Sequence, residues 1–429
     1  MGYLLRARTL TTCAALLASL PTASAARGAP LPEDPLAGAP VRETEHYRVL
    51  LADDEDLLED YARLVEAARR GFEQELGRRA RFEPGRKITL RLYPDRDAWE
   101  QGMTHEQVFA LPVADYVHYE PRNETVYAYG DPGQHFTRKM LLYGLFRQFH
   151  LRCKPKHQDL TQEWYLTGMA DVLSTHTWNG EDLVLGARRL LSHEDRASAA
   201  VGREVLSKLA GNELSVESLS DWDLRWALTA FLMYGEDGAY RKGFEKLALG
   251  KRGSMLLGRD YLSNLGDPQI ITAQLHAWLE AQAGALTPEM GSWRQVGGVL
   301  HAAVDPESAF AVALAPPDSK RIEAQHGDRG PSACGLVLDW FGPKDCMLAL
   351  RHDDILRVLH VQGREVLEIG VFDMAGKRAG RTLLSAELEG EEVHLRLGDE
   401  RLHTYDSHSR RLGLAVQTLE ASFERVAWE

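Results

Sequence analysis

The sequence has few cysteines and no long apolar run beyond its first residues, and both absences narrow the class of protein. Four cysteines among 429 residues are too few for a disulfide-stapled scaffold. No segment after residue 25 approaches the ~18 uninterrupted apolar residues that a transmembrane helix needs. Cys334 and Cys346 lie in a region rich in predicted strands and could pair in an oxidising compartment, which would leave Cys153 over.

Positive charge is also in short supply. The chain has 50 Lys and Arg against 63 Asp and Glu, which gives a formal net charge of -13. A protein with this balance repels phosphate backbones and anionic lipid, so we expect neither nucleic acid nor a membrane surface as a partner.

Most familiar catalytic motifs are missing. The sequence contains no Gly-x-Ser-x-Gly, no Walker A motif and no dinucleotide-binding fingerprint. His150 and His157 are seven apart across a Lys-Pro-Lys break, so they lack the fixed spacing that a metal site on a helix requires. We therefore expect no catalytic residue, no metal and no cofactor.

The N-terminal stretch reads MGYLLRARTLTTCAALLASLPTASAA and has the form of a secretory signal. Arg6 and Arg8 precede a short apolar run, and small residues follow it. We expect residues 1–25 to be cleaved and the mature protein to be secreted or periplasmic. Residues 26–42 are rich in proline and are expected to be a linker that does not pack.

The chain after this linker alternates between strand and helix patterns. A strand–helix–strand unit is predicted from HYRVLL, EDLLEDYARLVEAARRGFEQELG and KITLRLY, and a hairpin is predicted over 116–129. Helices are expected over 137–152 and 161–174, and Asn179-Gly180 predicts a two-residue hairpin turn. These elements make up an α/β core over 43–180, and a helical subdomain is expected over 181–286.

The predicted helix over 137–152 has the residue spacing of a zinc-peptidase helix but lacks the zinc ligands. Such a helix places two His four residues apart on one face, with a Glu beside the first His. Here Tyr143 stands four residues before Arg147, Gly144 follows Tyr143, and Thr167 lies on the next predicted helix.

Residues 45–285 resemble the gluzincin-type, peptidase-MA-like family in the order and spacing of KITLRLYPDRDAWEQ, YVHYEPRNETVYAYG, RQFHL and WYLTGMADVL. The family's helices read like HEATHQF and WLNEGLAEYF. The resemblance implies a mixed sheet with a helical subdomain. It sets Tyr143 and Arg147 at the two His positions, Gly144 at the Glu position and Thr167 at the third-ligand position. All four depart from the family's chemistry, while Asp171 matches an acid that supports a ligand.

These replacements predict a polar cluster in place of the metal. Arg147 carries a fixed positive charge that Asp171 or Glu163 can pair with, and the hydroxyl of Tyr143 can bond to Asp171. Gly144 costs about 1 kcal/mol against Ala in a helix interior, and nothing local in the sequence demands it. We interpret it as an inherited position that has lost its Glu.

Residues 290–429 have a different sequence pattern. They consist of short apolar runs at intervals of about ten residues, broken by Gly, Pro and Asp. The pattern predicts an antiparallel β-sandwich, and the closing LGLAVQTLEASFERVAW resembles the last strands of laminin-G or concanavalin-like jelly rolls. Trp340 and Tyr405 are candidates for stacking on sugars. The alternative is that Trp340 fills the sandwich core, because alternation buries one residue of each adjacent pair.

The predicted protein is thus an α+β, gluzincin-like scaffold without zinc ligands, joined to a β-sandwich. We expect it to bind peptide or glycan rather than to catalyse, with Arg147, Glu163 and Tyr119 as further ligand-binding candidates. A peptide would add as a strand to the edge of the 116–129 hairpin. The alternatives are a peptide or glycan hydrolase with an unrecognised site, and a structural role in an envelope assembly. The sequence does not give the oligomeric state.

Overall fold

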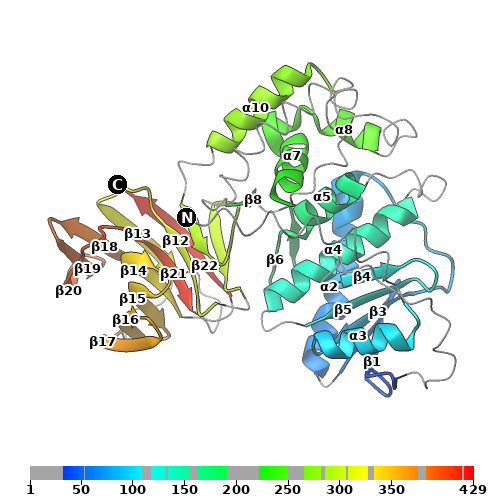
Figure 1. The fold of residues 1–429 in the computed structure, drawn as a ribbon, viewed down its shortest axis with the longest axis horizontal. Helices are drawn as coiled ribbons and strands as arrows, with labels where there is room; N and C mark the ends of the chain where they lie inside the picture. The colour runs from blue at the N-terminus through cyan, green and yellow to red at the C-terminus, as the bar shows by residue number, and fades with distance from the viewer. Residues whose placement is uncertain are drawn as a thin grey trace, which may run out of the picture.

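The computed structural model describes residues 32–52, 54–108, 117–130, 134–153, 163–186, 188–190, 222–248, 265–281, 286–305, 308–326, 333–374, 383–417 and 420–429. Figure 1 shows them as an α/β part, a helical part and a β-sandwich. In the described part of the chain, no helix combines the length and the apolarity needed to cross a membrane.

The α/β part is built on a five-stranded mixed sheet in the order β1-β2-β3-β5-β4. Its strands are β1 (Val41–Glu43), β2 (Tyr47–Leu51), β3 (Ile88–Tyr93), β4 (Val117–Glu120) and β5 (Thr125–Tyr129). β2, β3 and β5 run parallel, whereas β1 and β4 pair antiparallel at the two edges. The predicted strand–helix–strand unit and the predicted hairpin are confirmed.

Residues 32–43 pack along this sheet as a strap. Arg91 of β3 is buried, and its Nη2 lies 2.6 and 2.5 Å from the two carboxylate oxygens of Asp34. Leu36 is buried in an apolar cluster on the same side. The expectation of an unpacked linker is therefore wrong for its described residues, because an ion pair and apolar burial offset the entropy lost on ordering the chain.

Helix α2 (Glu55–Leu76) covers one face of the sheet and has clear signals at both ends. The side chain of Asp54 accepts a hydrogen bond from the backbone N of Leu57, and Gly77 ends the helix with φ of 57°. The short helix α3 (Arg96–His105) is capped in the same way by Asp95, which accepts from the backbone N of Ala98.

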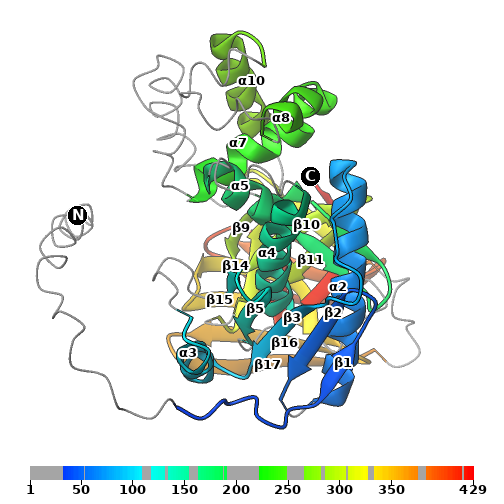
Figure 2. The ribbon, with the colours of Figure 1, turned by 90° about the vertical axis from the view of Figure 1, so that its right-hand side faces the viewer.

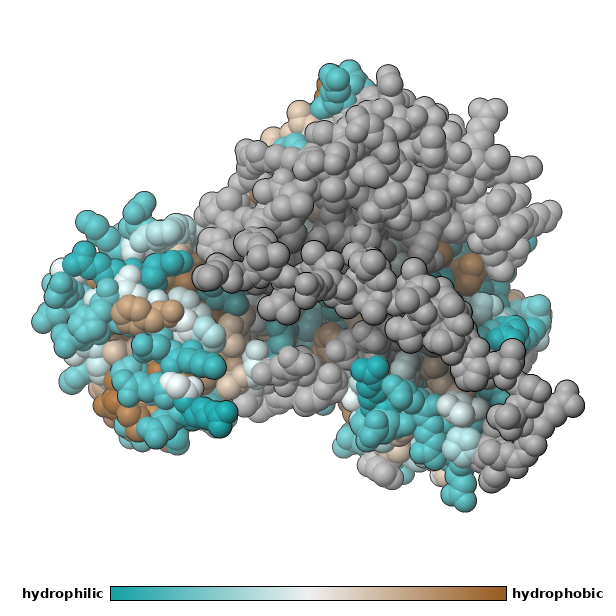
Figure 3. Space-filling view, viewed as in Figure 1, coloured by the Kyte–Doolittle hydropathy of each residue, from teal (hydrophilic) through white to brown (hydrophobic). Residues whose placement is uncertain are grey.

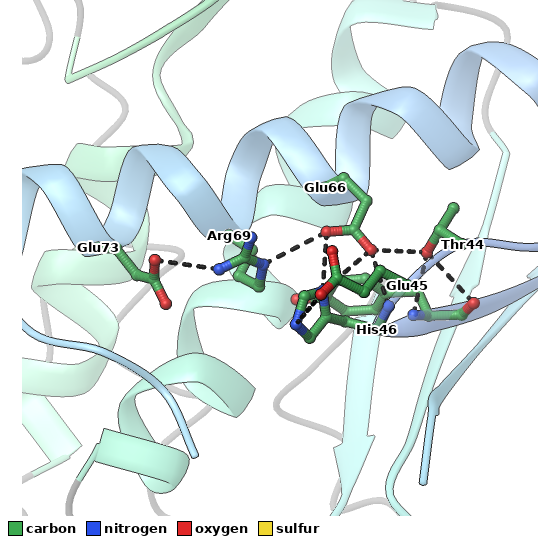
Figure 4. A network of polar contacts seen from close by, with 7 residues as sticks. Thr44, Glu45, His46, Glu66, Arg69 and Glu73 are labelled. Atoms are coloured by element: carbon green, nitrogen blue, oxygen red, sulfur yellow. Dashed lines mark hydrogen bonds and ion pairs between the residues drawn. The ribbon is translucent and has the colours of Figure 1, made fainter. Parts of the chain in front are cut away.

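A polar network ties the start of β2 to α2 (Figure 4). Glu66 Oε1 accepts hydrogen bonds from Thr44 Oγ1 and from the backbone N of His46, both at 2.8 Å. Arg69 Nε lies 3.3 Å from Glu66 Oε2. Burial alone would raise the pKa of Glu66, but the hydrogen bonds from His46 and Thr44 outweigh it and lower that pKa. Glu66 is thus held as a carboxylate that fixes the strand to the helix.

Helices α4 (Gln134–Cys153) and α5 (Glu163–Ser174) pack against each other, and α4 also contacts α2, β4 and β5. Phe146 and Phe149 of α4 lie against Phe72 of α2, with ring centroids 5.5 Å apart in both pairs. Apolar residues on nearly every side of this helix are explained by these neighbours. The predicted helix over 137–152 is confirmed and is slightly longer.

The helical part consists of α7 (Trp222–Tyr234), a 3-10 turn (Gly235–Gly238), α8 (Arg241–Ala248) and α10 (Pro268–Ala281). Figure 2 shows these helices beyond the end of α4, with α5 next to α7. The rest of the predicted helical subdomain, over 191–221 and 249–264, lies outside the described residues.

The Asn179-Gly180 turn is longer than predicted. Strands β6 (His176–Trp178) and β7 (Leu183–Leu185) pair antiparallel, and their last pair joins Trp178 to Leu183. The loop therefore has four residues. Asn179 Oδ1 accepts from the backbone N of Glu181 at 2.9 Å and from that of Asp182 at 2.7 Å, and Gly180 takes φ of 95°. The Asn side chain closes this loop as an Asx turn, which the two-residue prediction did not consider.

The predicted antiparallel β-sandwich is confirmed. One sheet has eight strands in the order β20-β19-β18-β13-β22-β11-β10-β8, and the other has seven in the order β17-β16-β15-β14-β21-β12-β9. The strands are β8 (Arg188–Arg189), β9 (Thr287–Met290), β10 (Ser292–Val296), β11 (Val299–Ala303), β12 (Phe310–Leu314), β13 (Arg321–His326), β14 (Ala333–Gly342), β15 (Asp345–His352), β16 (Ile355–Gln362), β17 (Glu365–Asp373), β18 (Leu384–Glu389), β19 (Glu392–Leu397), β20 (Glu400–Asp406), β21 (Gly413–Gln417) and β22 (Glu420–Trp428).

Strand β8 is one of the elements that the sequence patterns did not reveal. It comes from the stretch expected to be helical, yet Arg189 pairs with Arg294 and Arg188 with Gln295 at the edge of the eight-stranded sheet. The backbone of Leu190 also donates to the carbonyl of Trp293 at 2.9 Å. These bonds attach the sandwich to the rest of the chain.

The two sandwich cysteines do not form a disulfide, and Cys153, Cys334 and Cys346 are all free. On neighbouring strands, Cys346 lies opposite Trp340, and Cys334 lies opposite Arg351. Cys334 is therefore six residues along the strand from the partner of Cys346. At about 3.3 Å per residue this is roughly 20 Å, whereas a disulfide needs Cα atoms within about 7 Å.

Strand β17 forms one edge of the seven-stranded sheet and exposes large apolar side chains, namely Val366, Leu367, Ile369 and Val371. Figure 3 shows brown atoms at the lower end of the sandwich, where β17 lies. The pairing with β16 shifts register between Val358 and Leu359. A bulge of this kind, with Glu365 and Glu368 on the strand, limits pairing with a further chain.

Candidate functional site

The positions singled out on the predicted zinc helix lie on two helices that pack together. Tyr143, Gly144 and Arg147 are on α4, and Thr167 and Asp171 are on α5. All of them are buried except Arg147, which is half-buried. These positions therefore lie on two helices that are in contact, and their assembly into one site stays a prediction.

Gly144 faces the sheet, and the space there explains its identity. A Cβ at this position would lie 2.5 Å from Val117 Cγ2 of β4 and 3.2 Å from Val126 Cγ1 of β5. The interpretation that nothing local demands a glycine is wrong, because the helix approaches the sheet too closely for a side chain. A glutamate has no room at this point.

The charged residues of the region make two contacts that the sequence did not predict. Asp171 pairs with Lys139, whose Nζ lies 3.4 Å from Asp171 Oδ1. Burial lowers the pKa of His118 on β4, Glu120 opposes this, and the positive charge of Arg147 adds to the lowering. The structure thus brings Arg147 near His118 and Asp171 together with Lys139, and the predicted cluster of Tyr143, Arg147 and Asp171 stays a prediction.

The other sequence candidates are scattered. Tyr119 is half-buried on β4, and burial raises its pKa to about 12. Trp340 is only 8% exposed and packs in an apolar cluster on the seven-stranded sheet, so it is not a platform for a sugar, whereas Phe341 is 58% exposed. Tyr405 is half-buried with its ring 4.6 Å from that of His403. The side chain of Glu163 lies outside the described residues.

A group with metal-like spacing is already occupied by an arginine. Among the described residues, Asp34, His105 and Glu106 place their ligand atoms within 4.8 Å of one another. Arg91 binds both Asp34 and Glu106, with its Nη1 3.0 Å from Glu106 Oε1. Its positive charge neutralises these carboxylates, so the group is structural.

A cleft of about 730 Å³ lies between the α/β part and the sandwich, and the sequence did not predict it. This volume is in the range of sites for small ligands. One wall comes from α2, α4 and the β6–β7 hairpin, and the other from β10, β11 and β22. The polar and aromatic residues that line it are Asp60, Gln134, His135, Arg138, Thr177, Trp178, Asn179, Asp182, Arg294, His301, Glu420 and Ser422.

The sandwich wall presents a row of polar side chains across three strands. Arg294 lies opposite His301, and His301 lies opposite Ser422. Residues opposite each other share a face of a sheet, and alternate residues point to opposite faces. Trp293 accordingly points into the sandwich core, where its ring stacks on Phe423 with centroids 6.1 Å apart, while Arg294 points to the cleft.

The α/β wall is held together by Asp60 of α2. Its Oδ1 accepts a hydrogen bond from Trp178 Nε1 at 2.9 Å, which fixes the indole ring. Its Oδ2 lies 3.6 Å from Arg138 Nη2, which also donates to Gln134 Oε1 at 2.8 Å. Trp178 and Arg138 are therefore positioned by contacts within the α/β part.

Glu420 of the sandwich reaches across to this wall. Its Oε1 lies 2.8 Å from His135 Nδ1 and 3.4 Å from Arg294 Nη2, and its Oε2 lies 3.6 Å from Arg138 Nη1. Burial would raise the pKa of Glu420, but the contact with His135 and the charges of Arg294 and Arg138 outweigh it and hold that pKa well below its usual range. Glu420 is a carboxylate at neutral pH.

The histidines of the cleft are neutral at pH 7. Burial and the charge of Arg294 lower the pKa of His135 to about 4, and the same two causes lower the pKa of His301 to about 4. His135 stacks on His176, with centroids 4.7 Å apart and rings inclined by 16°. Burial and His135 hold the pKa of His176 well below its usual value.

Several buried polar atoms of the cleft have no hydrogen-bond partner among the described residues. They include Nε and Nη1 of Arg294, Nε of Arg138 and Oδ2 of Asp60. Arg294 is the extreme case, because it is only 3% exposed. Buried polar groups in native proteins are almost always paired, so unpaired donors that line a cavity indicate a place where a ligand or water binds.

A hairpin signal that the sequence analysis did not use could have indicated part of this wall. Gly297-Gly298 is a two-residue turn of the kind that joins antiparallel strands, and it sets Arg294 opposite His301. Nothing in the sequence pattern indicates that α4 and β22 meet, since they lie far apart along the chain.

No family model matches the chain, and no curated protein matches it. Solved structures similar to it include the carbohydrate-binding module CBM66 from Bacillus subtilis, with 18% identity, a TM-score of 0.28, and coverage of 34% of this chain and 94% of the module. A β-1,3-1,4-glucanase (lichenase) from a mouse hindgut metagenome has 9% identity, a TM-score of 0.24, and coverage of 32% and 82%. Sheep galectin-11 has 10% identity, a TM-score of 0.23, and coverage of 29% and 99%. The chain is thus similar to these proteins over about a third of its length, and no family assignment follows.

Proposed function

We propose that this protein is an exported binding protein without peptidase activity, and that it holds a glycan in the cleft between the α/β part and the sandwich. The observation that carries the proposal is the buried guanidinium of Arg294 on the wall of a ligand-sized cleft, whose Nε and Nη1 have no acceptor among the described residues. Each buried donor left without an acceptor costs about 1–3 kcal/mol, and a ligand that supplies acceptors offsets this cost.

The composition of the cleft favours a sugar. Trp178 offers an aromatic ring whose orientation is fixed by Asp60, and such a ring packs on the C–H face of a pyranose. Carboxylate, amide, guanidinium, imidazole and hydroxyl groups surround it, and these are the partners that sugar hydroxyls use as donors and acceptors.

The region of the predicted zinc helix supports the absence of peptidase activity. Tyr143, Arg147 and Thr167 stand where the resemblance puts zinc ligands, and Gly144 lies too close to Val117 for a catalytic glutamate. The mixed sheet, with α4 and α5 packed together, agrees with a gluzincin-like scaffold, and we keep that scaffold as part of the proposal. We also propose that the sandwich is related to laminin-G or concanavalin-like domains.

Glycan hydrolysis in the cleft is the less favoured alternative. A glycosidase needs one carboxylic acid that is protonated at the working pH. Glu420 is held ionised by Arg294 and Arg138, so it does not meet that need. We therefore expect saccharides to be bound and released unchanged.

A second candidate is peptide binding at β4. This strand is an edge of the five-stranded sheet, and an edge strand is where an extended peptide can add by main-chain hydrogen bonds. The two candidates are separated by titrating the full mature chain with an oligosaccharide panel and with a library of extended peptides. Calorimetric binding of saccharide that is weakened about tenfold by Trp178→Ala supports the cleft, whereas binding of peptide alone supports β4.

A further inference from the structure

We infer that the glycan held in the cleft carries a carboxylate group, and that the guanidinium of Arg294 binds this carboxylate. The inference rests on the proposed function, because it names the class of saccharide that the same cleft takes. The class is the acidic saccharides, in which uronic acid residues supply one planar carboxylate per sugar ring.

The first reason is the number of free donors on Arg294. A guanidinium has five N–H groups, of which Nε carries one and Nη1 carries two. Within the part of the chain that the structure describes, neither atom has an acceptor. The contact that Nη2 makes with Glu420 is 3.4 Å, which is longer than the 2.7–2.9 Å of a strong charge-assisted hydrogen bond. The fold thus leaves most of the hydrogen-bonding capacity of this buried cation unused.

The second reason is the distribution of negative charge. The carboxylate of Glu420 lies closest to His135, at 2.8 Å. It makes longer contacts with Arg294, at 3.4 Å, and with Arg138, at 3.6 Å, so its negative charge is shared between the two arginines. Asp60 is directed to Trp178 and Arg138. Arg294 is therefore the cleft cation with the least compensation, and a ligand carboxylate supplies the missing charge.

The third reason is the row of groups beside Arg294. His301 and Ser422 follow it on the next two strands of the same face. With neighbouring strands about 4.8 Å apart, the row spans about 10 Å, which matches one to two sugar rings. Neutral His301 and the Ser422 hydroxyl can each donate to or accept from sugar hydroxyls.

The carboxylates of the cleft select against more highly charged ligands. Asp60, Asp182 and Glu420 line it together with the two arginines. A doubly charged phosphate group meets repulsion from these acids, whereas a singly charged planar carboxylate fits the plane of a guanidinium. The geometry points to a uronic acid rather than to a sugar phosphate.

The test uses isothermal titration of the full mature chain with tetrasaccharides of galacturonic, glucuronic, mannuronic and guluronic acid. Each is paired with its carboxyl-reduced counterpart, which keeps the ring and removes the charge. We expect at least one acid to bind ten times or more tightly than its reduced form. Arg294→Gln should abolish that preference. Arg294→Lys should keep part of it, because lysine keeps the positive charge but cannot make the two parallel hydrogen bonds that a guanidinium makes to a carboxylate.

The exposed Arg357, which pairs with Glu368 on the sandwich, provides the matched control, and Arg357→Gln should leave the preference unchanged. Equal binding of acid and reduced forms by the unmodified protein overturns the inference while the proposed glycan-binding function stands. Binding of no saccharide refutes the proposed function itself. The comparison of ligands on the unmodified protein stays decisive even if the Arg294 variants fail to fold.

Discussion

Gly144 of α4 and Val117 of β4 are in such close contact that a Cβ on the glycine would lie 2.5 Å from Val117 Cγ2. In the gluzincin-like alignment that we propose, Gly144 takes the position of the catalytic glutamate, and this contact leaves no room for a glutamate there. The different residues at the ligand positions of that alignment and this close packing are the two reasons for which we propose that the protein lacks peptidase activity.

We expect Gly144→Ala to lower the free energy of unfolding by about 1–2 kcal/mol. The packing cost of an added methyl group, about 1–3 kcal/mol, exceeds the gain of about 1 kcal/mol in helix propensity. Urea unfolding of the single variant and of Gly144→Ala with Val117→Ala measures this. The two changes should compensate for each other in the double variant, and a more stable Gly144→Ala protein would contradict the packing account.

Asp34→Asn should release the strap and destabilise the protein by about 2–4 kcal/mol, because it leaves the buried Arg91 without its principal counter-charge. Hydrogen exchange should rise over the described strap residues. Glu43→Gln, which removes an exposed partner of Lys87, is the control and should change stability by less than about 0.5 kcal/mol. Similar effects of both changes would show that the strap is not held by Arg91.

Stability should fall steeply as the pH drops from about 6.5 to about 4. The pKa of His135 and of His301 is about 4 in the folded protein and about 6.5 when unfolded, so the unfolded chain binds more protons in this range. Stability therefore rises with pH there, by at most about 1.4 kcal/mol per pH unit for each histidine. Unfolding curves at pH 4.5, 5.5 and 7 measure the slope.

Two matched variants test the origin of this change of unfolding free energy with pH. His135→Gln should reduce the slope, whereas His352→Gln, which alters an exposed histidine of the sandwich, should leave the slope unchanged. An unchanged slope in His135→Gln would mean that the acid sensitivity arises elsewhere.

Glu420→Gln should weaken the attachment of the sandwich to the α/β part. The amide cannot balance the charges of Arg294 and Arg138, so we expect a loss of about 1–3 kcal/mol. Differential scanning calorimetry should show a lower or split transition. Glu424→Gln alters an exposed residue of the same strand and should leave the transition in place. Identical traces for the two variants would contradict the role of Glu420 as a bridge.

Regular elements were the part of this fold that sequence patterns predicted well. Apolar periodicity gave α2, α4 and the strands of the sandwich, and the four residues after Glu120 gave the β4–β5 hairpin. These features depend on neighbours in the chain or on simple alternation, which a sequence displays directly. The gluzincin-like character of the α/β part stays a prediction.

The candidate site could not be predicted in the same way. Glu420, His135 and Arg294 meet only because α4 and the eight-stranded sheet pack together, and their separation in the sequence hides this. Gly144 was misread for a related reason, since its neighbour Val117 comes from another element. The strap was predicted to be a linker because it is rich in proline. The ion pair between Asp34 and Arg91 that holds it to the sheet cannot be seen in the sequence.

The crystal structure of the protein with its tightest-binding saccharide tests the central claim most directly. The account predicts a sugar in the cleft, with its ring over Trp178 and an oxygen within about 3.2 Å of Arg294 Nη1 or Nε. A saccharide bound elsewhere on the sandwich, with the cleft containing only water, would contradict it.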